Sequence, residues 1–256
     1  MHLLALHGFT GSGADWELPA SALASRRSDL RWSTPDLPGH GGFLPDPPAY
    51  TVPAMAASVA AAALKLPRPR VLVGYSMGGR VALQAAVSWP ERFDAVVLIG
   101  AHPGIGDADE RRARATEDAA RAARIRAVGA AAFCAEWARV PIISTQDRVP
   151  EPWRGALRDR RTRCSTEGLA RAAEIGGTGS MEPLWERLAR LPRALVAAGA
   201  DDAKYLGIAA EIAGAAPEAT PASIPGAGHA AHLEAPEAFA ERLDRFLTSV
   251  SPTLSP

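Results

Sequence analysis

The segment Gly74-Tyr75-Ser76-Met77-Gly78 carries the residue types that most directly suggest chemistry. A serine held in a sharp strand-to-helix turn needs small neighbours, because larger side chains there would collide with the adjoining strand and helix. The apolar run 71–73 before it and the helix-like run 79–83 after it provide that context. We therefore predict a nucleophile elbow with Ser76 at its tip. The alternative is a glycine-rich turn that carries an incidental serine.

A carboxylate and a histidine follow Ser76 in the order that a catalytic triad on this kind of turn requires. Asp201 and Asp202 come after the apolar run 194–198, and His229 lies in a glycine-rich loop that can present an imidazole. A histidine between Ser76 and the acid could take or return the serine proton, while the carboxylate fixes its tautomer. We predict the triad Ser76, Asp202 and His229. Asp201 remains open as the acid, and the alternative for His229 is a loop histidine without a role.

His7-Gly8-Phe9 follows the first apolar run and can complete the site. The backbone N–H groups of Phe9 and Met77 are predicted to form an oxyanion hole, in which each donor contributes about 3 kcal/mol in other enzymes. His40 lies in Asp36-Leu37-Pro38-Gly39-His40-Gly41, which we interpret mainly as a Pro-Gly turn. His232 is predicted to be structural.

The elements that must position these residues are visible as an alternation. Short apolar runs at 3–6, 71–74, 95–99 and 194–198 alternate with helical patterns such as 52–64 and 80–87. This alternation predicts an α/β fold whose mainly parallel sheet has helices on both faces. From about residue 105 to 190 the pattern is helical, arginine-rich and interrupted by prolines, which indicates an inserted helical cap. The predicted parts are a core over 1–104 and 191–248, a cap over 105–190 and a flexible tail over 249–256.

Composition excludes several classes of function. A chain of 256 residues fits one α/β domain with an insertion, and its 28 basic and 28 acidic residues give a net charge of +0. No positive field exists for nucleic acid or an anionic membrane, so we expect neither as a partner. The N-terminal apolar run is too short for a signal peptide, and no later run is long enough for a membrane span. Two cysteines, Cys134 and Cys164, make no disulfide framework or zinc site and favour a reducing cytoplasm.

A longer series of motifs recurs in one order along nearly the whole chain: Leu6-His7-Gly8-Phe9, Asp36-Leu37-Pro38-Gly39-His40-Gly41, Gly74-Tyr75-Ser76-Met77-Gly78-Gly79-Arg80, Gly177-Thr178-Gly179, Leu184-Trp185, Asp202-Ala203-Lys204-Tyr205 and Gly228-His229-Ala230-Ala231-His232-Leu233-Glu234. The series resembles the α/β-hydrolase superfamily. Within it, the closer resemblance is to the 2-succinyl-6-hydroxy-2,4-cyclohexadiene-1-carboxylate synthases of menaquinone and phylloquinone biosynthesis. Many hydrolases share the elbow and His-Gly-Phe, whereas Ser-Met-Gly-Gly-Arg and Gly-Thr-Gly are more discriminating.

The resemblance implies a carbon–oxygen lyase that needs no cofactor and no metal. Such an enzyme eliminates pyruvate from 2-succinyl-5-enolpyruvyl-6-hydroxy-3-cyclohexene-1-carboxylate. It also implies that the triad removes a ring proton, with Ser76 as the immediate base, and that the enolate oxygen lies between the N–H groups of Phe9 and Met77. An enolate oxygen and a tetrahedral oxyanion need the same donors.

A small polycarboxylate substrate needs several cations, for which arginine is best suited. The resemblance implies that substrate-binding residues are Arg80, Arg114, Arg161, Tyr75 and Trp137; Arg158, Arg160 and Arg163 remain alternatives to Arg161, and a solvated helix face is the alternative for any cap arginine. One departure from the family pattern places Glu182 after Gly-Thr-Gly, where a carboxylate facing the pocket would repel the substrate.

Two other functions are compatible with parts of the sequence. A serine hydrolase of an ester, lactone or carbon–carbon bond in a carboxylated metabolite would use the same triad. Arg80, one turn beyond Ser76, argues against a hydrolase of apolar esters. A non-catalytic binding protein on this scaffold would be expected to have lost triad residues, yet all three are present.

Overall fold

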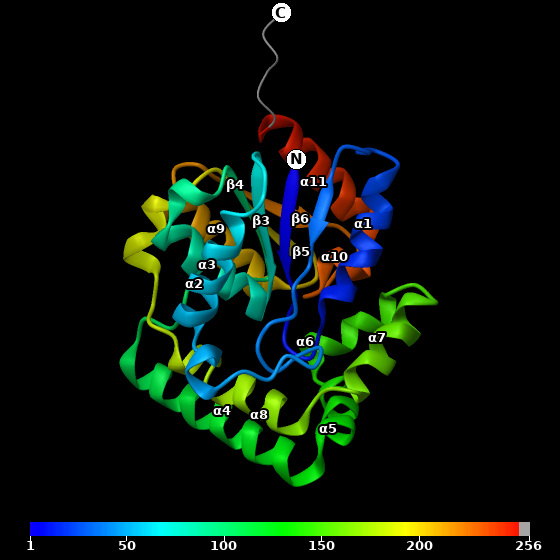
Figure 1. The fold of residues 1–256 in the computed structure, drawn as a ribbon, viewed down its shortest axis with the longest axis vertical. Helices are drawn as coiled ribbons and strands as arrows, with labels where there is room; N and C mark the ends of the chain where they lie inside the picture. The colour runs from blue at the N-terminus through cyan, green and yellow to red at the C-terminus, as the bar shows by residue number, and fades with distance from the viewer. Residues whose placement is uncertain (251–256) are drawn as a thin grey trace, which may run out of the picture.

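The computed structural model describes residues 1–250, which form one six-stranded parallel sheet with helices around it (Figure 1). The strand order is β2-β1-β3-β4-β5-β6, and every neighbouring pair is parallel. The strands are β1 (His2–Leu6), β2 (Arg31–Ser33), β3 (Arg70–Tyr75), β4 (Ala95–Ile99), β5 (Ala194–Gly199) and β6 (Ala219–Ile224). The central strands are buried on both faces, which is why they appear as unbroken apolar runs in the sequence.

Each face of the sheet is covered by its own group of helices. On one face pack α2 (Val52–Ala63), α3 (Met77–Ser88) and α9 (Ala203–Ala215), and on the other α1 (Glu17–Ala24), α10 (Ala231–Glu234) and α11 (Pro236–Val250). Alternate strand residues serve the two cores: Leu72 points to the first group and Val73 to the second.

A cap of five helices lies across the carboxyl end of the sheet (Figure 1). Its helices are α4 (Ala108–Val128), α5 (Ala130–Trp137), α6 (Pro141–Ser144), α7 (Trp153–Thr162) and α8 (Thr166–Glu174). Short 3-10 helices complete the described chain: η1 (Gly13–Trp16), η2 (Pro47–Tyr50), η3 (Pro90–Arg92), η4 (Thr145–Arg148), η5 (Thr178–Ser180) and η6 (Trp185–Arg190). The cap has a small core of its own that includes Ile125, Phe133 and Leu169. Because parallel strands all end at this edge, the loops that carry the candidate catalytic residues lie on the side of the sheet that faces the cap.

The predicted α/β fold with an inserted helical cap is confirmed, and the differences from the prediction are local. Strand β6 was not predicted because Pro221 and the exposed residues beside it break the apolar pattern. An edge strand tolerates such a proline. The helix after the elbow begins at Met77 rather than at Arg80, because the chain enters the helix directly after Ser76.

The predicted end of the cap and the predicted tail also differ from the structure. Met181, Leu184 and Leu188 pack in the same cluster as α2 and α3, so the core resumes before the predicted boundary at residue 190. Ser249 and Val250 complete α11 rather than belonging to a flexible tail, and the rest of that predicted segment lies outside the described residues.

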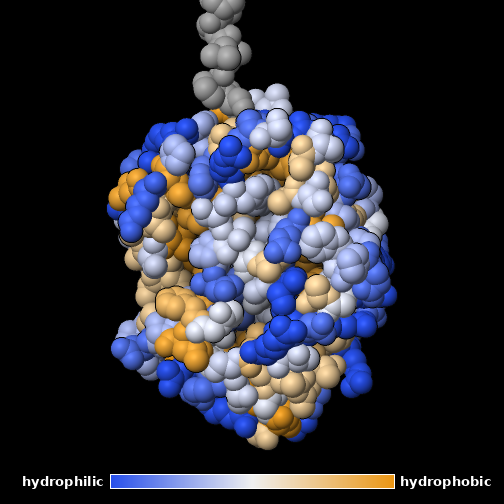
Figure 2. Space-filling view, turned by 45° about the vertical axis from the view of Figure 1, so that its right-hand side comes forward, coloured by the Kyte–Doolittle hydropathy of each residue, from blue (hydrophilic) through white to orange (hydrophobic). Residues whose placement is uncertain are grey.

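The surface view shows hydrophilic, intermediate and apolar side chains mixed over the visible face (Figure 2). Among the described residues, the large hydrophobic side chains that are exposed are Phe43, Leu44 and Leu64. Within residues 1–250, no helix combines the length and the hydropathy needed to cross a membrane.

Candidate active site

Ser76 occupies the tight turn between β3 and α3. Its φ of 50° and ψ of −107° lie outside the regions that most residues adopt. Its N–H donates to the carbonyl of Ile99 at 2.9 Å. A Cβ at Gly74 would lie 2.5 Å from the carbonyl oxygen of Gly78, and one at Gly78 would lie 2.4 Å from that of Leu6. The turn is therefore strained, and it closes because both flanking residues lack side chains.

His229 lies between Ser76 and Asp202. Its Nε2 is 3.0 Å from the Ser76 Oγ, and its Nδ1 is 2.9 Å from Asp202 Oδ2. The other carboxylate oxygen of Asp202 caps α9 by accepting the N–H of Tyr205 at 3.3 Å. Asp201, the open alternative, makes an ion pair at the surface and is half exposed. The geometry therefore selects Asp202 as the partner of His229, and the three groups can pass a proton between them.

The sequence reasoning missed a buried carboxylate that holds the histidine loop. Glu234 accepts the N–H groups on either side of His229, from Gly228 at 2.6 Å and from Ala230 at 3.0 Å. It also accepts the Thr145 hydroxyl of the cap at 2.8 Å. The sequence offers one signal for Glu234, its position five residues after His229 in a recurring motif. That position does not reveal which groups the carboxylate contacts.

The backbone N–H groups of Phe9 and Met77 belong to residues that line the same cavity as Ser76. Within residues 1–250, neither N–H donates to another protein group. The next N–H along α3, that of Gly78, donates to the carbonyl of His7 at 3.1 Å and so ties the elbow to the Phe9 loop. Two free donors beside the serine can stabilise a developing oxyanion.

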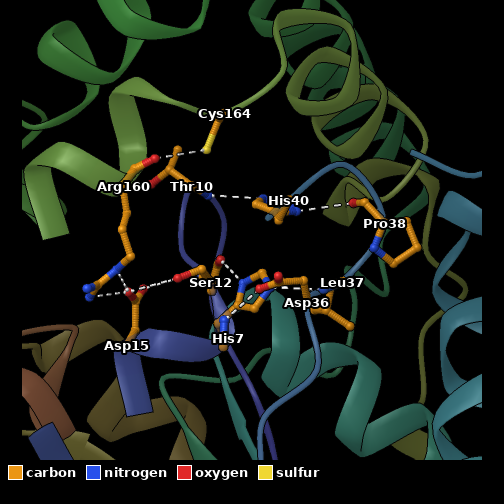
Figure 3. A network of polar contacts seen from close by, with 12 residues as sticks. His7, Thr10, Ser12, Asp15, Asp36, Leu37, Pro38, His40, Arg160 and Cys164 are labelled. Carbon is orange, nitrogen blue, oxygen red and sulfur yellow. Dashed lines mark hydrogen bonds and ion pairs between the residues drawn. The ribbon is translucent and has the colours of Figure 1, made fainter. Parts of the chain in front are cut away.

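His7 and His40 support the Phe9 loop (Figure 3). Thr10 adopts a φ of 65°, and its N–H donates to His40 Nε2 at 3.2 Å. The N–H of Leu37 donates to His7 Nε2 at 3.0 Å. Burial lowers the pKa of His40 to about 3 and also lowers the pKa of His7, so both rings stay neutral and can accept these bonds. His40 is therefore part of the loop's scaffold, a role that its interpretation as a turn residue did not include.

His232 is also structural, as predicted. Its ring packs against Trp16 and Tyr75, with centroids 4.7 and 4.5 Å away. Burial lowers its pKa to about 3. The proton path does not need His232, because His229 already bridges the serine and the acid.

A cavity of about 90 Å³ lies above Ser76, between the core and the cap. Arg80 reaches it from α3, and Arg114 and Trp137 reach it from the cap, so the structure brings these three predicted residues together. Arg80 donates to the carbonyl of Gly176 at 2.9 Å. Burial, together with the nearby charges of Arg114 and Arg121, lowers the pKa of its guanidinium to about 10, so the group remains protonated at neutral pH.

The structure does not bring Arg161 or Tyr75 to the wall of this cavity. Arg161 donates to Gln146 Oε1 at 2.6 Å, and the amide of the same glutamine is 3.4 Å from the Tyr75 hydroxyl. Tyr75 is buried beneath the loop of Gly8, where a Cβ would lie 2.6 Å from its ring. The bond to Gln146 joins Arg161 of α7 to η4.

The alternatives to Arg161 lie elsewhere too. Arg160 pairs with Asp15 of the core at 2.9 Å (Figure 3), and Arg158 pairs with Asp147 at 2.8 Å. Arg163 lines a separate surface cavity. Glu182, which would repel the substrate if it faced the pocket, is exposed and does not line the cavity.

The cavity wall contains residues that the sequence reasoning missed. Arg121 and Asp118 line it from α4, His102 follows β4, and Tyr205 begins α9. Burial lowers the pKa of His102 to about 4, so the ring is neutral. The signal for Asp118 and Arg121 was their spacing of four and seven residues after Arg114, which places all three on one helix face. Within residues 1–250, no three His, Cys, Asp or Glu residues gather as a metal site would require.

Comparison with known proteins identifies the family. The pattern of the "Alpha/beta hydrolase family" matches residues 3–242. The 2-succinyl-6-hydroxy-2,4-cyclohexadiene-1-carboxylate synthase of Serratia proteamaculans is 32% identical, over 96% of this chain and 93% of its own. A Bacillus subtilis protein provisionally given the same name is 35% identical, over 97% of this chain and 90% of its own. The chain belongs to the 2-succinyl-6-hydroxy-2,4-cyclohexadiene-1-carboxylate synthase family of α/β hydrolases.

A solved structure supports the membership of this synthase family. The structure of MenH from S. aureus matches with a TM-score of 0.89 at 28% identity, covering 98% of this chain and 94% of that one. The match extends through the cap as well as the core, because both chains are covered almost completely. The resemblance stated from the motifs is thereby confirmed.

Proposed function

We propose that this member of the synthase family eliminates pyruvate from 2-succinyl-5-enolpyruvyl-6-hydroxy-3-cyclohexene-1-carboxylate, giving 2-succinyl-6-hydroxy-2,4-cyclohexadiene-1-carboxylate for menaquinone biosynthesis. The observation that carries the proposal is the juxtaposition of two features in one cavity. One is the Ser76 hydroxyl, hydrogen-bonded to His229 at 3.0 Å. The other is a set of three guanidinium groups, from Arg80, Arg114 and Arg121.

The first chemical step is removal of the ring proton beside the succinyl ketone. Ser76 Oγ takes this proton while its own proton moves to His229 Nε2, and Asp202 stabilises the resulting imidazolium through Nδ1. The electrons of the broken C–H bond move onto the ketone oxygen, which becomes an enolate. The N–H groups of Phe9 and Met77 are the proposed donors to that oxygen.

The second step expels the enolpyruvyl group. The ketone re-forms, and the enolate electrons form a new double bond in the ring. The original ring double bond shifts by one position toward the carbon that carries the enolpyruvyl group, and the bond between that carbon and the ether oxygen breaks. The leaving group departs as enolpyruvate and becomes pyruvate on protonation. The proton held by His229 can be the one transferred. Because Ser76 keeps the proton taken from the ring, both side chains then return to their starting protonation states.

Substrate recognition is proposed to rest on the arginines. A polycarboxylate brings several negative charges into a site where water is scarce, and arginine forms paired, charge-assisted bonds with carboxylates. The cavity of about 90 Å³ is smaller than the roughly 300 Å³ at the low end for small-molecule sites. We therefore expect the cap to move away from the core as substrate enters, since Arg114 and Trp137 form its outer wall.

We further propose that the reaction needs no cofactor and takes place in the cytoplasm. Every step above uses a side chain or a backbone N–H group. Both cysteines are free thiols, in keeping with a reducing compartment.

The experiment is a pyruvate-release assay with purified enzyme and the enolpyruvyl substrate. Wild-type protein is expected to release pyruvate with no added metal or nucleotide, and Ser76→Ala is expected to lose at least about a thousandfold in kcat. Pyruvate release no faster than in buffer, together with rapid hydrolysis of a simple ester, would replace this proposal with the serine-hydrolase alternative.

A further inference from the structure

Helix α4 presents a charged cluster to the active-site cavity. Asp118 is almost completely buried, with its side chain 1% exposed. Its Oδ1 accepts Arg114 Nε at 2.9 Å and also an N–H of Arg121, and its Oδ2 accepts the N–H of Gly179 at 3.1 Å. A buried carboxylate with three donors is fully satisfied and holds its partners in fixed positions.

The cluster leaves hydrogen-bonding capacity directed at the cavity. Arg114 uses only its Nε on Asp118, and Arg121 uses one terminal nitrogen. Their remaining N–H groups have no protein acceptor among residues 1–250. The Arg121 guanidinium also lies 5.3 Å from the centroid of the Trp137 ring, which fixes its plane. The guanidinium groups of Arg114 and Arg121 are thus held side by side, each with N–H groups that remain available to a ligand.

The balance of charge in the cavity wall is positive. Arg80, Arg114 and Arg121 supply three cations, whereas Asp118 is the one carboxylate among the described wall residues. Arg80 is bonded to a carbonyl oxygen and not to an acid. An excess of two positive charges in a partly buried site is costly unless an anion is bound there.

We propose that Arg121 binds a substrate carboxylate together with Arg114, and that Asp118 is a positioning residue that aligns both guanidinium groups. This inference rests on the proposed function for the identity of the substrate. Arg121 thereby fills the role that the sequence reasoning gave to Arg161. One carboxylate oxygen of the substrate would accept from each arginine, opposite the oxygen of Asp118 that they share.

Close contact with α4 explains why the Gly177-Thr178-Gly179 segment needs its glycines. A Cβ at Gly177 would lie 2.3 Å from Asp118 Oδ2, and one at Gly179 would lie 2.2 Å from the backbone nitrogen of Ala115. A side chain at either position would push the segment away from α4. The carboxylate would then lose the Gly179 N–H, which is the donor to its Oδ2.

The test compares Arg121→Gln with Arg124→Gln. Arg124 lies three residues further along α4, is half exposed and pairs with Glu136 outside the cavity, so its loss is a matched control. In the pyruvate-release assay, Arg121→Gln is expected to raise KM about 10- to 100-fold with kcat changed less than about threefold. Arg124→Gln is expected to leave both unchanged. A KM for Arg121→Gln within twofold of wild type would overturn the inference.

The positioning role of Asp118 has its own readout. Asp118→Asn keeps the size of the side chain, and it is expected to raise KM as Arg121→Gln does. If Asp118 acts through the arginines, adding Asp118→Asn to Arg121→Gln raises KM much less than the product of the single effects. Full multiplicative effects would refute positioning. If Asp118→Asn does not fold, Arg121→Lys replaces it as the test. Lysine keeps the positive charge without the fork geometry, so Arg121→Lys should bind substrate more tightly than Arg121→Gln. Equal KM values for the two variants would contradict carboxylate binding.

Calorimetry with tricarballylate, a simple tricarboxylate, separates this inference from the proposed function. Wild-type protein is expected to bind it, and Arg121→Gln to bind at least tenfold more weakly. If the wild type releases no pyruvate but this difference holds, the proposed reaction fails and the carboxylate site stands. If pyruvate is released and neither KM nor tricarballylate binding responds to Arg121→Gln, the inference fails and the reaction stands.

Discussion

Replacement of Arg80 by methionine should change the free energy of unfolding little but lower the activity strongly. The guanidinium is buried, and the fall of its pKa from 12.5 to about 10 corresponds to roughly 3 kcal/mol of cost for holding the charge in place. The substitution removes that cost but leaves the carbonyl of Gly176 without its donor, which costs about 1–3 kcal/mol. The two effects nearly cancel, so the free energy of unfolding without ligand should change by no more than about 1–2 kcal/mol.

Activity should respond very differently to Arg80→Met. A charge-assisted bond to a substrate carboxylate contributes about 1.5–3 kcal/mol, so kcat/KM for the polycarboxylate should fall roughly 10- to 150-fold. Turnover of a neutral ester, where detectable, should fall much less.

The assay pairs urea unfolding in the absence of ligand with steady-state pyruvate release. Arg124→Met provides the control, because that arginine is exposed and lies outside the cavity. Two results would refute the reasoning. A loss of more than about 3 kcal/mol in unfolding free energy would mean that Arg80 is mainly a structural link between core and cap. Equal loss of activity toward charged and neutral substrates would remove the carboxylate role.

Three further outcomes follow from the site and its supports. Asp202→Asn should lower kcat by about 10³–10⁴, because the amide favours the wrong imidazole tautomer, and a fall below tenfold in pyruvate release would contradict a triad role. Gly78→Ala should lower the melting temperature, because its Cβ would lie 2.4 Å from a backbone oxygen of β1, whereas Gly207→Ala on α9 meets nothing within 4 Å and serves as the control; equal melting curves would contradict the packing argument. The buried rings of His40 and His232, with each pKa lowered to about 3, stay neutral in the folded state, while the unfolded chain takes up protons below about pH 6.5. Unfolding free energy should therefore fall as pH is lowered from 7 to 5, by about 2 kcal/mol per ring, and constant stability by urea titration at the two pH values would contradict this.

Much of the core followed from local patterns. Buried parallel strands must be apolar on both faces, so runs such as 95–99 were recognisable without any tertiary information. The elbow was recognisable because its geometry demands glycine at Gly74 and Gly78. Edge strand β6 was not, since it contains Pro221 and has exposed residues that break the apolar signal.

Part of the candidate site was likewise predictable from the sequence, and part was not. The order of Ser76, Asp202 and His229 along the chain predicted their relationship, because the carboxyl ends of all the strands of a parallel sheet lie at one edge. The choice between Asp201 and Asp202 could not be made by sequence, since adjacent side chains point in different directions and only one meets the imidazole.

Chain order and residue type by themselves determined the fold class and the elbow. Buried parallel strands must be apolar along their length, and the turn at Ser76 closes only with glycine at Gly74 and Gly78. Only the tertiary structure decided which arginines share the cavity. A helix can present an arginine to the substrate or to solvent, and its neighbours on other helices make that choice. Arg161 is bonded to Gln146 and does not line the cavity, whereas Arg121 is bonded to Asp118 and does.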